Sequence, residues 1–505
     1  MIPQADSPAL SAFFVFFKGL HVQWFSEHWN TENAYSLFWL IWSVYALVIG
    51  VWVLLQRSAP VATLGWLLAL AALPVGGLGV YYFFGPQRLK RLRNKRLRRH
   101  KSSRLRVSAA RLRDHIPAAS ARMHQVARLV NRTAEFPVSS AERMELLVGG
   151  DRTYESILEA VRAARHHVHL EYYVFEPDQT GTALMDALVE RARAGVKVRM
   201  LVDSMGSKKI RRKFYAPLVE AGGEFAFFHP SKVGRRLRPV INFRTHRKIL
   251  VCDGKVGFTG GVNITDEESR RVMDCAYHDV HLRLEGPVVN WLQTVFLEDW
   301  SYALERSHPV EPPDLDVLLP DMAEGQYAVQ IVSSGPDNRL EAIHRAYVAA
   351  INAADARVWL TTPYFVPTEA AMTALTNAAL RGVDVQLLVP EKSDSFIVTM
   401  AARSYFDELI ACGAKVYEYR ARMLHSKTLV VDDNMAIIGT ANFDHRSFFL
   451  NYEVCAIGYG LKLNGDLAKQ FTLDLQNARQ VHYERKQRFL PRLGDSIARL
   501  CSPLL

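Results

Sequence analysis

The 505-residue sequence has little cysteine, and none of it is arranged as C-x-x-C. Its five cysteines are Cys252, Cys275, Cys412, Cys455 and Cys501. An odd number of scattered cysteines excludes a small disulfide-stabilised scaffold. It is typical of thiols that stay reduced, and it offers no spacing for a structural zinc ion. The sequence also lacks G-x4-G-K-[ST] and G-x-G-x-x-G, the glycine-rich loops that bind ATP and dinucleotides. We therefore expect neither a metal ion nor another cofactor.

Acidic residues are absent between Pro86 and Arg113, where 13 of the 62 Lys and Arg residues lie. The rest of the chain holds 49 basic residues against 51 acidic ones, so this segment alone produces the net charge of +11. A protein that binds nucleic acid along its surface needs basic residues over that surface, because much of the affinity comes from displaced counterions. The distribution therefore excludes a general nucleic-acid binder, and no nucleic-acid partner is expected.

Charge of either sign is nearly absent before that segment, since Arg57 is the only charged residue between Glu32 and Arg88. Two apolar runs fill this stretch, Ser36–Leu55 and Val61–Phe84, and each is long enough as a helix to cross roughly 30 Å of hydrocarbon. The residues between them suffice only for a tight turn, so the sequence predicts a transmembrane hairpin over residues 36–85. A cleaved signal peptide does not fit, because the chain lacks a basic start and the apolar run is long and doubled. A hairpin buried in a protein core is the remaining alternative.

The basic residues follow the hairpin directly, in a collar and linker that we assign to residues 86–137. Basic residues beside a membrane span indicate the cytoplasmic side. Leucines among them favour an amphipathic segment on an anionic lipid surface. The sequence therefore predicts a multi-pass anchor with the rest of the chain in the cytoplasm.

The remainder of the chain is built twice. Strands and helices alternate in the first copy over residues 144–148, 153–165, 167–175, 181–194 and 196–202, and in the second over residues 327–332, 340–353, 357–365, 369–381 and 383–389. This alternation is typical of an α/β fold, and the duplication indicates two such units side by side. We expect mostly parallel sheets flanked by helices, related by a pseudo-two-fold axis. The two domains are expected at residues 138–309 and 327–505, with a linker at 310–326 and a separate N-terminal segment at 1–35.

One motif occurs in each copy, with an offset of 179 residues. It reads H-x-K-x4-D-x6-G-x2-N and contains His246, Lys248, Asp253 and Asn263 in the first copy, and His425, Lys427, Asp432 and Asn442 in the second. On a strand, H-x-K directs an imidazole and an ammonium to the same face, because side chains alternate. Two copies facing each other would surround one phosphate with a nucleophile, a general acid and groups that stabilise negative charge. The sequence thus predicts chemistry at phosphorus without a metal.

The paired motif resembles the HKD hallmark of the phospholipase D superfamily. The flanking residues are similar to one family within it, the bacterial cardiolipin synthases. Gly260–Glu268, Asp279–Gly286, Gly439–Ser447 and Asn451–Glu453 carry this likeness, together with the apolar hairpin and the basic collar. The resemblance extends from about Ser36 onward and implies two tandem phospholipase D-like domains behind the membrane anchor.

This resemblance implies an enzyme that transfers a phosphatidyl group between two phosphatidylglycerol molecules and releases glycerol. His246 would attack phosphorus to form a phosphohistidine, and His425 would be the general acid. The symmetric motifs by themselves do not tell which histidine is the nucleophile. The other roles implied by the family are catalytic contacts of Lys248 and Lys427, substrate binding by Asn263, Asn442 and Thr440, orientation of the histidines by Asp279 and Glu453, and a mostly structural part in the catalytic motif for Asp253 and Asp432.

Related enzymes use the same motif with another acceptor. A membrane-anchored phospholipase D or phosphatidyltransferase that uses water or another alcohol is therefore an alternative. A lipid-binding or nucleic-acid-binding protein is a third interpretation, and the two intact motifs weigh against it. The D-G-x2-A-R signature of CDP-alcohol phosphotransferases is absent, which weighs against CDP-diacylglycerol as donor.

The resemblance also implies partners and a location. We expect phosphatidylglycerol and anionic lipids as partners, at the bacterial inner (cytoplasmic) membrane with the catalytic domains on its cytoplasmic side. Oligomerisation is possible, and the sequence leaves the oligomeric state, the acyl-chain preference and the role of residues 1–35 open.

Overall fold

The computed structural model describes residues 31–55, 60–73, 77, 81, 121–229, 243–304, 315–482, 489–500 and 502. The chain divides into two units, Met1–Leu92 and Arg93–Leu505. Residues 1–30, most of residues 74–120 and the first residues of the predicted linker, 310–314, lie outside the described residues. Most of the predicted N-terminal segment and the basic residues 86–113 therefore fall outside them, whereas residues 121–137 of the predicted collar and linker are described.

The N-terminal unit contains two helices, α2 (Thr31–Leu54) and α3 (Pro60–Ala72). They pack through a small apolar cluster that includes Val53 and Leu70. The second span predicted from the sequence is longer than α3, whose 13 residues extend only about 20 Å. Pro74 comes two positions after Ala72, the last residue of α3. A proline disfavours helical backbone in the residue before it, here Leu73. Within the described part of the chain, no helix combines the length and the apolarity needed to span a membrane.

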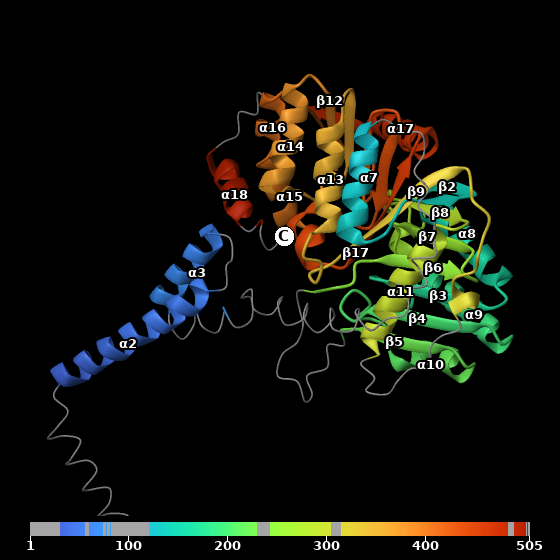
Figure 1. The fold of residues 1–505 in the computed structure, drawn as a ribbon, viewed down its shortest axis with the longest axis horizontal. Coiled ribbons are helices and arrows are strands. Elements are labelled where there is room, and N and C mark those ends of the chain that lie inside the picture. Colours follow the sequence, from blue (N-terminus) through green and yellow to red (C-terminus); the bar gives the residue numbers. More distant parts are fainter. Residues whose placement is uncertain are drawn as a thin grey trace, which may run out of the picture. The chain divides into compact units, whose positions relative to one another are not determined.

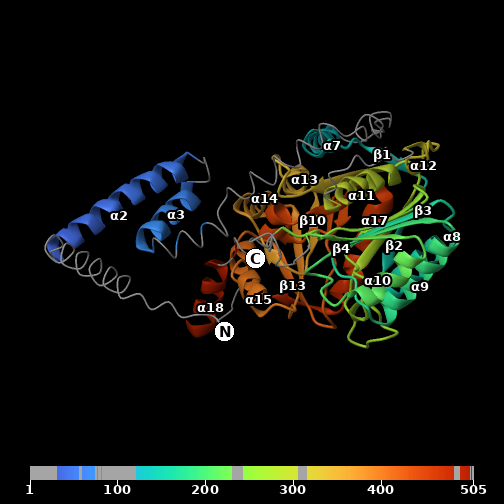
Figure 2. The same cartoon turned by 90° about the horizontal axis from the view of Figure 1, so that it is seen from below.

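The first catalytic half is a seven-stranded sheet in the order β2-β8-β7-β6-β3-β4-β5. Its strands are β2 (Arg143–Val148), β3 (His167–Tyr172), β4 (Lys197–Asp203), β5 (Glu224–Phe228), β6 (Lys248–Cys252), β7 (Val256–Gly260) and β8 (Val280–Glu285). One face is covered by α8 (Gly150–Ala163), α9 (Gln179–Arg193) and α10 (Arg212–Glu220), and the other by α11 (Val289–Ala303) (Figures 1 and 2).

The second half repeats this order as β9-β17-β15-β14-β10-β12-β13, with one added strand at each edge. Its strands are β9 (Tyr327–Ser334), β10 (Arg357–Thr361), β12 (Asp384–Pro390), β13 (Lys415–Tyr419), β14 (Thr428–Val431), β15 (Met435–Gly439) and β17 (Glu453–Tyr459), with β1 (Ser139–Ala141) and β18 (Ala478–Val481) at the edges. A small separate sheet joins β11 (Phe365–Val366) and β16 (Phe443–Asp444).

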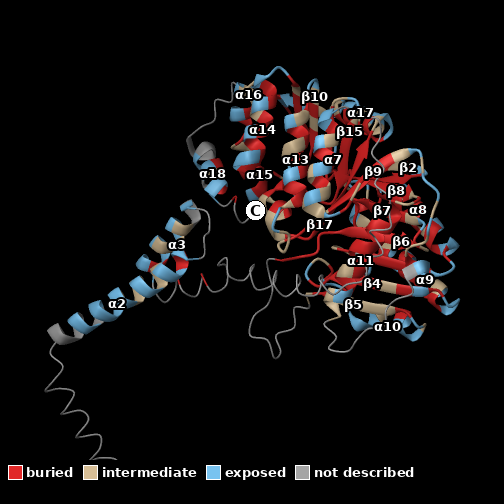
Figure 3. Cartoon of the chain, in the orientation of Figure 1, coloured by how far each residue is buried: buried red, intermediate tan, exposed pale blue. Residues whose placement is uncertain are grey.

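Helices cover both faces of this larger sheet as well. The helices are α7 (Ala121–Ala134), α13 (Ala342–Ala353), α14 (Glu369–Leu380), α15 (Phe396–Arg403), α16 (Phe406–Ala411), α17 (Leu461–Leu475) and α18 (Phe489–Leu500), with the short α12 (Leu315–Leu318) before β9. Figure 1 shows α7, α13 and α14 side by side, while α17 covers the opposite face. Figure 3 shows the buried residues concentrated in the strands and in the helix faces turned toward them.

The sheets are mixed, which corrects the expectation of mostly parallel sheets. In the first half only β3–β4 and β4–β5 pair in parallel, and in the second sheet only β10–β12 and β12–β13 do. Parallel neighbours need a crossover of a dozen or more residues, but only three residues join β6 to β7 and β14 to β15. These connections force antiparallel hairpins. The duplicated α/β architecture itself is confirmed by the identical strand order.

The chain segment before the first half packs on the second half. Strand β1 pairs antiparallel with β9, and α7 contacts α13. Across the seam in the other direction, α11 contacts β9 and α17 contacts β2. The two halves are therefore interlocked along their adjoining edges, where the two motifs lie.

Candidate active site

The two motifs lie at the seam, each paired with a segment of the opposite half. His246 N–H donates to the carbonyl oxygen of Tyr452 at 2.9 Å, and His425 N–H donates to the carbonyl oxygen of His278 at 2.8 Å. The sequence predicts both histidines on strands, but β6 begins only at Lys248 and β14 begins after Lys427. The histidines stand on extended segments just before the strands, because their backbone groups bond the other half instead of continuing the sheet ladder.

Each imidazole is held by a carboxylate from the opposite half. His246 Nδ1 lies 3.0 Å from Glu453 Oε2, and His425 Nδ1 lies 2.7 Å from Asp279 Oδ2. Both carboxylates are fully buried. A carboxylate that accepts from Nδ1–H fixes the tautomer in which Nε2 carries the lone pair, and it stabilises the imidazolium. The orienting contacts predicted for Asp279 and Glu453 are therefore present, and they cross between the halves.

The motif lysines are buried beside the histidines. Lys248 Nζ donates to the His246 carbonyl oxygen at 3.0 Å, and Lys427 Nζ donates to that of His425. Lys427 Nζ also lies 3.6 Å from Asp279 Oδ2. These contacts hold two ammonium groups next to two imidazoles, an arrangement suited to an anion.

Burial determines the protonation of the histidines. It lowers the pKa of His246 to about 4, although the Glu453 carboxylate acts in the opposite direction. Burial and the Lys427 ammonium lower the pKa of His425, while Asp279 raises it. Burial, with the neighbouring Lys427, also lowers the pKa of Lys248 to about 7. His246 is consequently neutral at physiological pH, as a nucleophilic imidazole must be.

The motif glycines are required by neighbouring backbone. A Cβ at Gly260 would lie 2.7 Å from Cα of His281 on β8, and one at Gly439 would lie 2.5 Å from the carbonyl oxygen of Val454 on β17. The close approach is thus made by β8, which directly follows Asp279, and by β17, which begins at Glu453. Glycine is needed because a side chain would push these strands away.

The predicted substrate-binding residues divide into two kinds. Asn263 and Asn442 are buried near the motifs, and each has a side-chain Oδ1 without a hydrogen-bond partner among the described residues. Thr440 is different, because its hydroxyl donates to Glu453 Oε2 at 2.5 Å. The hydroxyl therefore supports the carboxylate that contacts His246, and a contact of Thr440 with substrate stays a prediction.

Asp253 and Asp432 lie apart from the imidazoles. Each follows its strand and has a positive φ, 55° and 48° respectively. Asp253 accepts hydrogen bonds from the backbone N–H groups of residues 165–167, and Asp432 from those of residues 355–357. Each aspartate follows its histidine by seven positions of largely extended chain, roughly 20 Å. These contacts join the β6–β7 and β14–β15 turns to the start of β3 and β10, and a mostly structural part remains our expectation for both aspartates.

Replacing Asp432 with alanine is therefore expected to lower the free energy of unfolding by about 2 kcal/mol, because three backbone N–H groups lose their acceptor. The turnover of folded enzyme should change little. Chemical denaturation combined with an activity assay measures both effects. Asp433→Ala is the matched control, since that neighbouring side chain is 81% exposed. A loss of turnover without a loss of stability would contradict this assignment.

Sequence reasoning missed Tyr277 and the part played by Glu268. Tyr173 is expected, from its place near the end of a predicted strand, to line the mouth of the pocket or to have a structural role. The ring of Tyr173 lies 5.0 Å from the His246 ring, and that of Tyr277 lies 5.6 Å from the His425 ring. Glu268 is fully buried, with Oε1 3.7 Å from His425 Nδ1. Position is the only sequence signal for these residues: Tyr277 precedes Asp279 by two residues, and Glu268 follows the motif asparagine by five.

One group of described residues has the donor atoms for a cation. Ligand atoms of Glu268, Asp279 and His425 lie within 4.8 Å of one another. Asp279, however, already contacts the His425 imidazole and the Lys427 ammonium. These two groups compete with a divalent cation for the same carboxylate, so the arrangement fits proton transfer better than metal binding.

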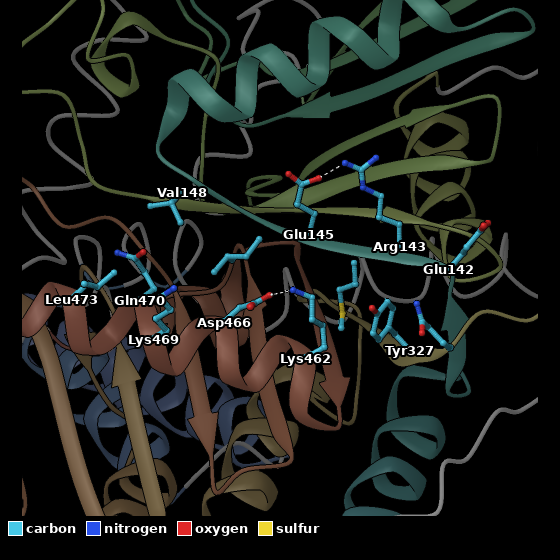
Figure 4. A pocket seen from close by; sticks show the side chains of 13 residues that line it. Glu142, Arg143, Glu145, Val148, Tyr327, Lys462, Asp466, Lys469, Gln470 and Leu473 are labelled. Atoms are coloured by element: carbon cyan, nitrogen blue, oxygen red, sulfur yellow. Dashed lines mark hydrogen bonds and ion pairs between the residues drawn. The ribbon is translucent and has the colours of Figure 1, made fainter.

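Another groove lies elsewhere on the seam. It has a volume of about 730 Å³ and runs between β2 and α17. Figure 4 shows ion pairs on its two walls, Arg143 with Glu145 and Lys462 with Asp466. No motif residue lines it. Charges that are already paired within each wall give this groove no preference for an anionic headgroup.

Comparisons with known proteins agree with the geometry. A family model described as "Cardiolipin synthase, PLD-like domain" matches residues 157–300 and 347–475. "Cardiolipin synthase 1" of Bacillus anthracis is 36% identical over 486 residues, which are 94% of this chain and 95% of the relative. "Cardiolipin synthase" of Geobacillus kaustophilus is 39% identical over 481 residues, 93% of this chain and 94% of the relative.

Among solved structures, the phosphatidylserine synthase of Haemophilus influenzae matches with a TM-score of 0.57 at 15% identity, covering 75% of this chain and 100% of that one. That likeness concerns the fold alone. Two intact motifs at one seam and full-length relatives lead to one conclusion: the chain belongs to the cardiolipin synthase family of phospholipase D-like enzymes.

Proposed function

We propose that the chain makes cardiolipin by transferring a phosphatidyl group from one phosphatidylglycerol to another. The observation that carries this proposal is the crossed arrangement of the motifs. Two imidazoles, each on a carboxylate of the other half, stand with two ammonium groups at one buried seam. This arrangement supplies a nucleophile, an acid and charge stabilisation for a phosphodiester.

In the first step, Nε2 of neutral His246 attacks the phosphorus of phosphatidylglycerol. The bond from phosphorus to the headgroup glycerol oxygen breaks. His425, in the imidazolium form that the Asp279 carboxylate stabilises against the effect of burial, gives its proton to that oxygen. Glycerol leaves, and the phosphatidyl group stays on His246. Lys248 and Lys427 hold the non-bridging oxygens, whose charge grows in the transition state.

In the second step, His425 is neutral and acts as the base. It takes the proton from a glycerol hydroxyl of a second phosphatidylglycerol, whose oxygen attacks phosphorus while the bond to His246 breaks. The sum is two phosphatidylglycerols converted into cardiolipin and glycerol, with both histidines restored. Two in-line displacements retain the configuration at phosphorus.

We further propose that the N-terminal unit holds the enzyme in the bacterial inner membrane as a hairpin, with the catalytic halves on the cytoplasmic side. Support comes from the near absence of charge before Arg88 and the basic residues after it. It also comes from the exposed apolar side chains of α2 and α3, such as Leu47 at 68% and Leu68 at 63% exposure. Such a surface is unfavourable in water and favourable in lipid.

Purified full-length enzyme in vesicles of phosphatidylglycerol alone tests the reaction. The expected products, followed by lipid mass spectrometry, are cardiolipin and free glycerol in equal amounts. Phosphatidic acid without cardiolipin would mean that water is the acceptor and would overturn the proposal. Adding a second soluble alcohol to the vesicles reports whether other acceptors compete.

A further inference from the structure

The two halves differ at the position five residues after the motif asparagine. Glu268 stands there in the first half and Ser447 in the second. Both accept a hydrogen bond from the asparagine N–H: Asn263 to Glu268 Oε1 at 3.2 Å, and Asn442 to Ser447 Oγ at 3.1 Å. The two positions are therefore equivalent in the fold, but only the glutamate is long enough to reach an imidazole.

Glu268 has an unusual environment for a carboxyl group. Its side chain is fully buried. Oε1 lies 3.7 Å from His425 Nδ1 and accepts hydrogen bonds from Asn263, while Oε2 has no hydrogen-bond partner among the described residues. Among the described residues, no lysine or arginine lies within 4 Å of it. Asp279, already bonded to His425, is the neighbouring carboxylate. Ionising two adjacent buried carboxyl groups costs much free energy, because the two negative charges repel each other away from water. One of the two groups therefore retains a proton.

The directions of the two pKa shifts favour Glu268 as the group that keeps the proton. Burial, and then the charge of Asp279, raise the pKa of Glu268 to about 8. Burial also acts to raise the pKa of Asp279, but Lys427 and His425 outweigh it and the net change is downward. At neutral pH the His425 side of the site therefore contains one ionised and one neutral carboxyl group.

The His246 side is built differently. There Thr440 donates its hydroxyl to Glu453, the carboxylate of His246. The first half has Gly261 in place of Thr440, and a Cβ there would lie 2.0 Å from Asp279 Oδ1. No hydroxyl therefore fits beside Asp279, and Glu268 is the additional proton-bearing group on this side.

We propose that Glu268 is a positioning residue for His425. Glu268 is held as a neutral carboxylic acid against the His425–Asp279 pair, so that a single negative charge lies beside the imidazole. The imidazole can therefore both give a proton and take one back. Without that neutrality, a second charge near Nδ1 would stabilise the imidazolium and slow proton delivery to the leaving glycerol. This inference deepens the proposed function and rests on it for its catalytic part.

A cavity of about 230 Å³ lies beside this group. It is lined by Glu268, Arg270, Tyr277 and Arg422, and it shares Val148 with the groove of Figure 4. The charged and titratable groups facing Glu268 are Asp279, His425, Lys427, Lys248, Tyr154, Tyr277, Arg270 and Arg422.

The first test needs no substrate. Infrared spectra of wild type minus Glu268→Gln should contain the carbonyl band of a protonated carboxylic acid at about pH 7, and that band should disappear as the pH rises through about 8. Glu268→Ser, which copies the residue of the second half, is the second variant in case glutamine disturbs folding. Glu145→Gln, on the wall of the surface groove, is the control and should remove no such band. Absence of the band at about pH 7 would overturn the proposal.

Unfolding provides an independent measurement. The folded pKa of about 8 exceeds the ordinary 4.5, so the folded chain keeps a proton that the unfolded chain has lost between these values. Wild-type stability is therefore expected to fall as the pH rises through this window, and Glu268→Gln should lack that part of the fall. Parallel stability curves for the two proteins would contradict a protonated Glu268.

The catalytic part is tested by pH profiles of transfer in phosphatidylglycerol vesicles. Near pH 6.5, Glu268→Gln should transfer within about threefold of wild type, because glutamine is neutral like the acid. Above about pH 8 the transfer rate of the variant, relative to that of wild type, should rise at least about threefold. Only wild type acquires a second negative charge beside His425 in this range. A constant ratio across the pH range would refute the positioning role. Failure of wild type to make cardiolipin would refute the proposed function instead, and the infrared band would still report on Glu268.

Discussion

Replacing His246 with alanine is expected to lower phosphatidyl transfer by at least about 10³-fold, because no other group can form the covalent intermediate. His425→Ala should cause a comparable loss with phosphatidylglycerol as donor, because glycerol is a poor leaving group without a proton. The activities of the two variants should differ when the donor carries an acidic leaving group such as p-nitrophenol. That group needs no general acid, so His425→Ala should still release it in one burst, while His246→Ala should not.

The measurement is rapid-mixing release of p-nitrophenol together with mass spectrometry of the trapped phosphohistidine. His166→Ala is the control, because this histidine is exposed and precedes β3. A burst from His246→Ala and none from His425→Ala would exchange the two roles. The pKa of about 4 for His246 adds a further expectation, since the nucleophile should become protonated, and the burst should vanish, only when the pH falls toward about 4.

Removing the charge of an orienting carboxylate should be nearly as damaging. Asp279→Asn and Glu453→Gln are each expected to lower transfer about 10²–10⁴-fold while leaving the fold intact. An amide in place of the carboxylate no longer holds the Nδ1 proton, so the imidazole adopts the wrong tautomer, and the imidazolium loses its counter-charge. Transfer rates in vesicles combined with ¹⁵N NMR of the imidazoles measure both consequences.

The crossed geometry makes this prediction specific. Asp279→Asn should alter the spectrum of His425, and Glu453→Gln that of His246, although each pair belongs to different halves. Asp474→Asn provides the matched control, because Asp474 is a buried aspartate bonded to His278 Nε2 at 2.7 Å, outside the motifs. A change confined to the histidine of the same half would refute the crossed arrangement.

The sequence by itself determined the duplicated α/β architecture and the chemical content of the site. Helices and strands such as 144–148 and 369–381 are readable because their apolar periods depend on neighbours along the chain. The motif is readable because it recurs at a fixed offset, which fixes the histidines and lysines without any coordinates. The resemblance to cardiolipin synthases rests on the same contiguous residues, and the full-length relatives agree with it.

Tertiary structure alone decided how these parts are used. Glu453 orients His246 across 207 residues, and Asp279 orients His425 across 146, pairings that no local period encodes. The hydroxyl of Thr440 and the carboxyl of Glu268 acquire their roles because folding buries them against a carboxylate, where desolvation and hydrogen bonding fix the proton. Asp253 belongs to the motif in sequence, but it lies roughly seven extended residues away from the His246 imidazole, because strand β6 lies between the two residues. Local sequence fixes which residues are present, and only the long-range packing of the two halves decides which of them meet.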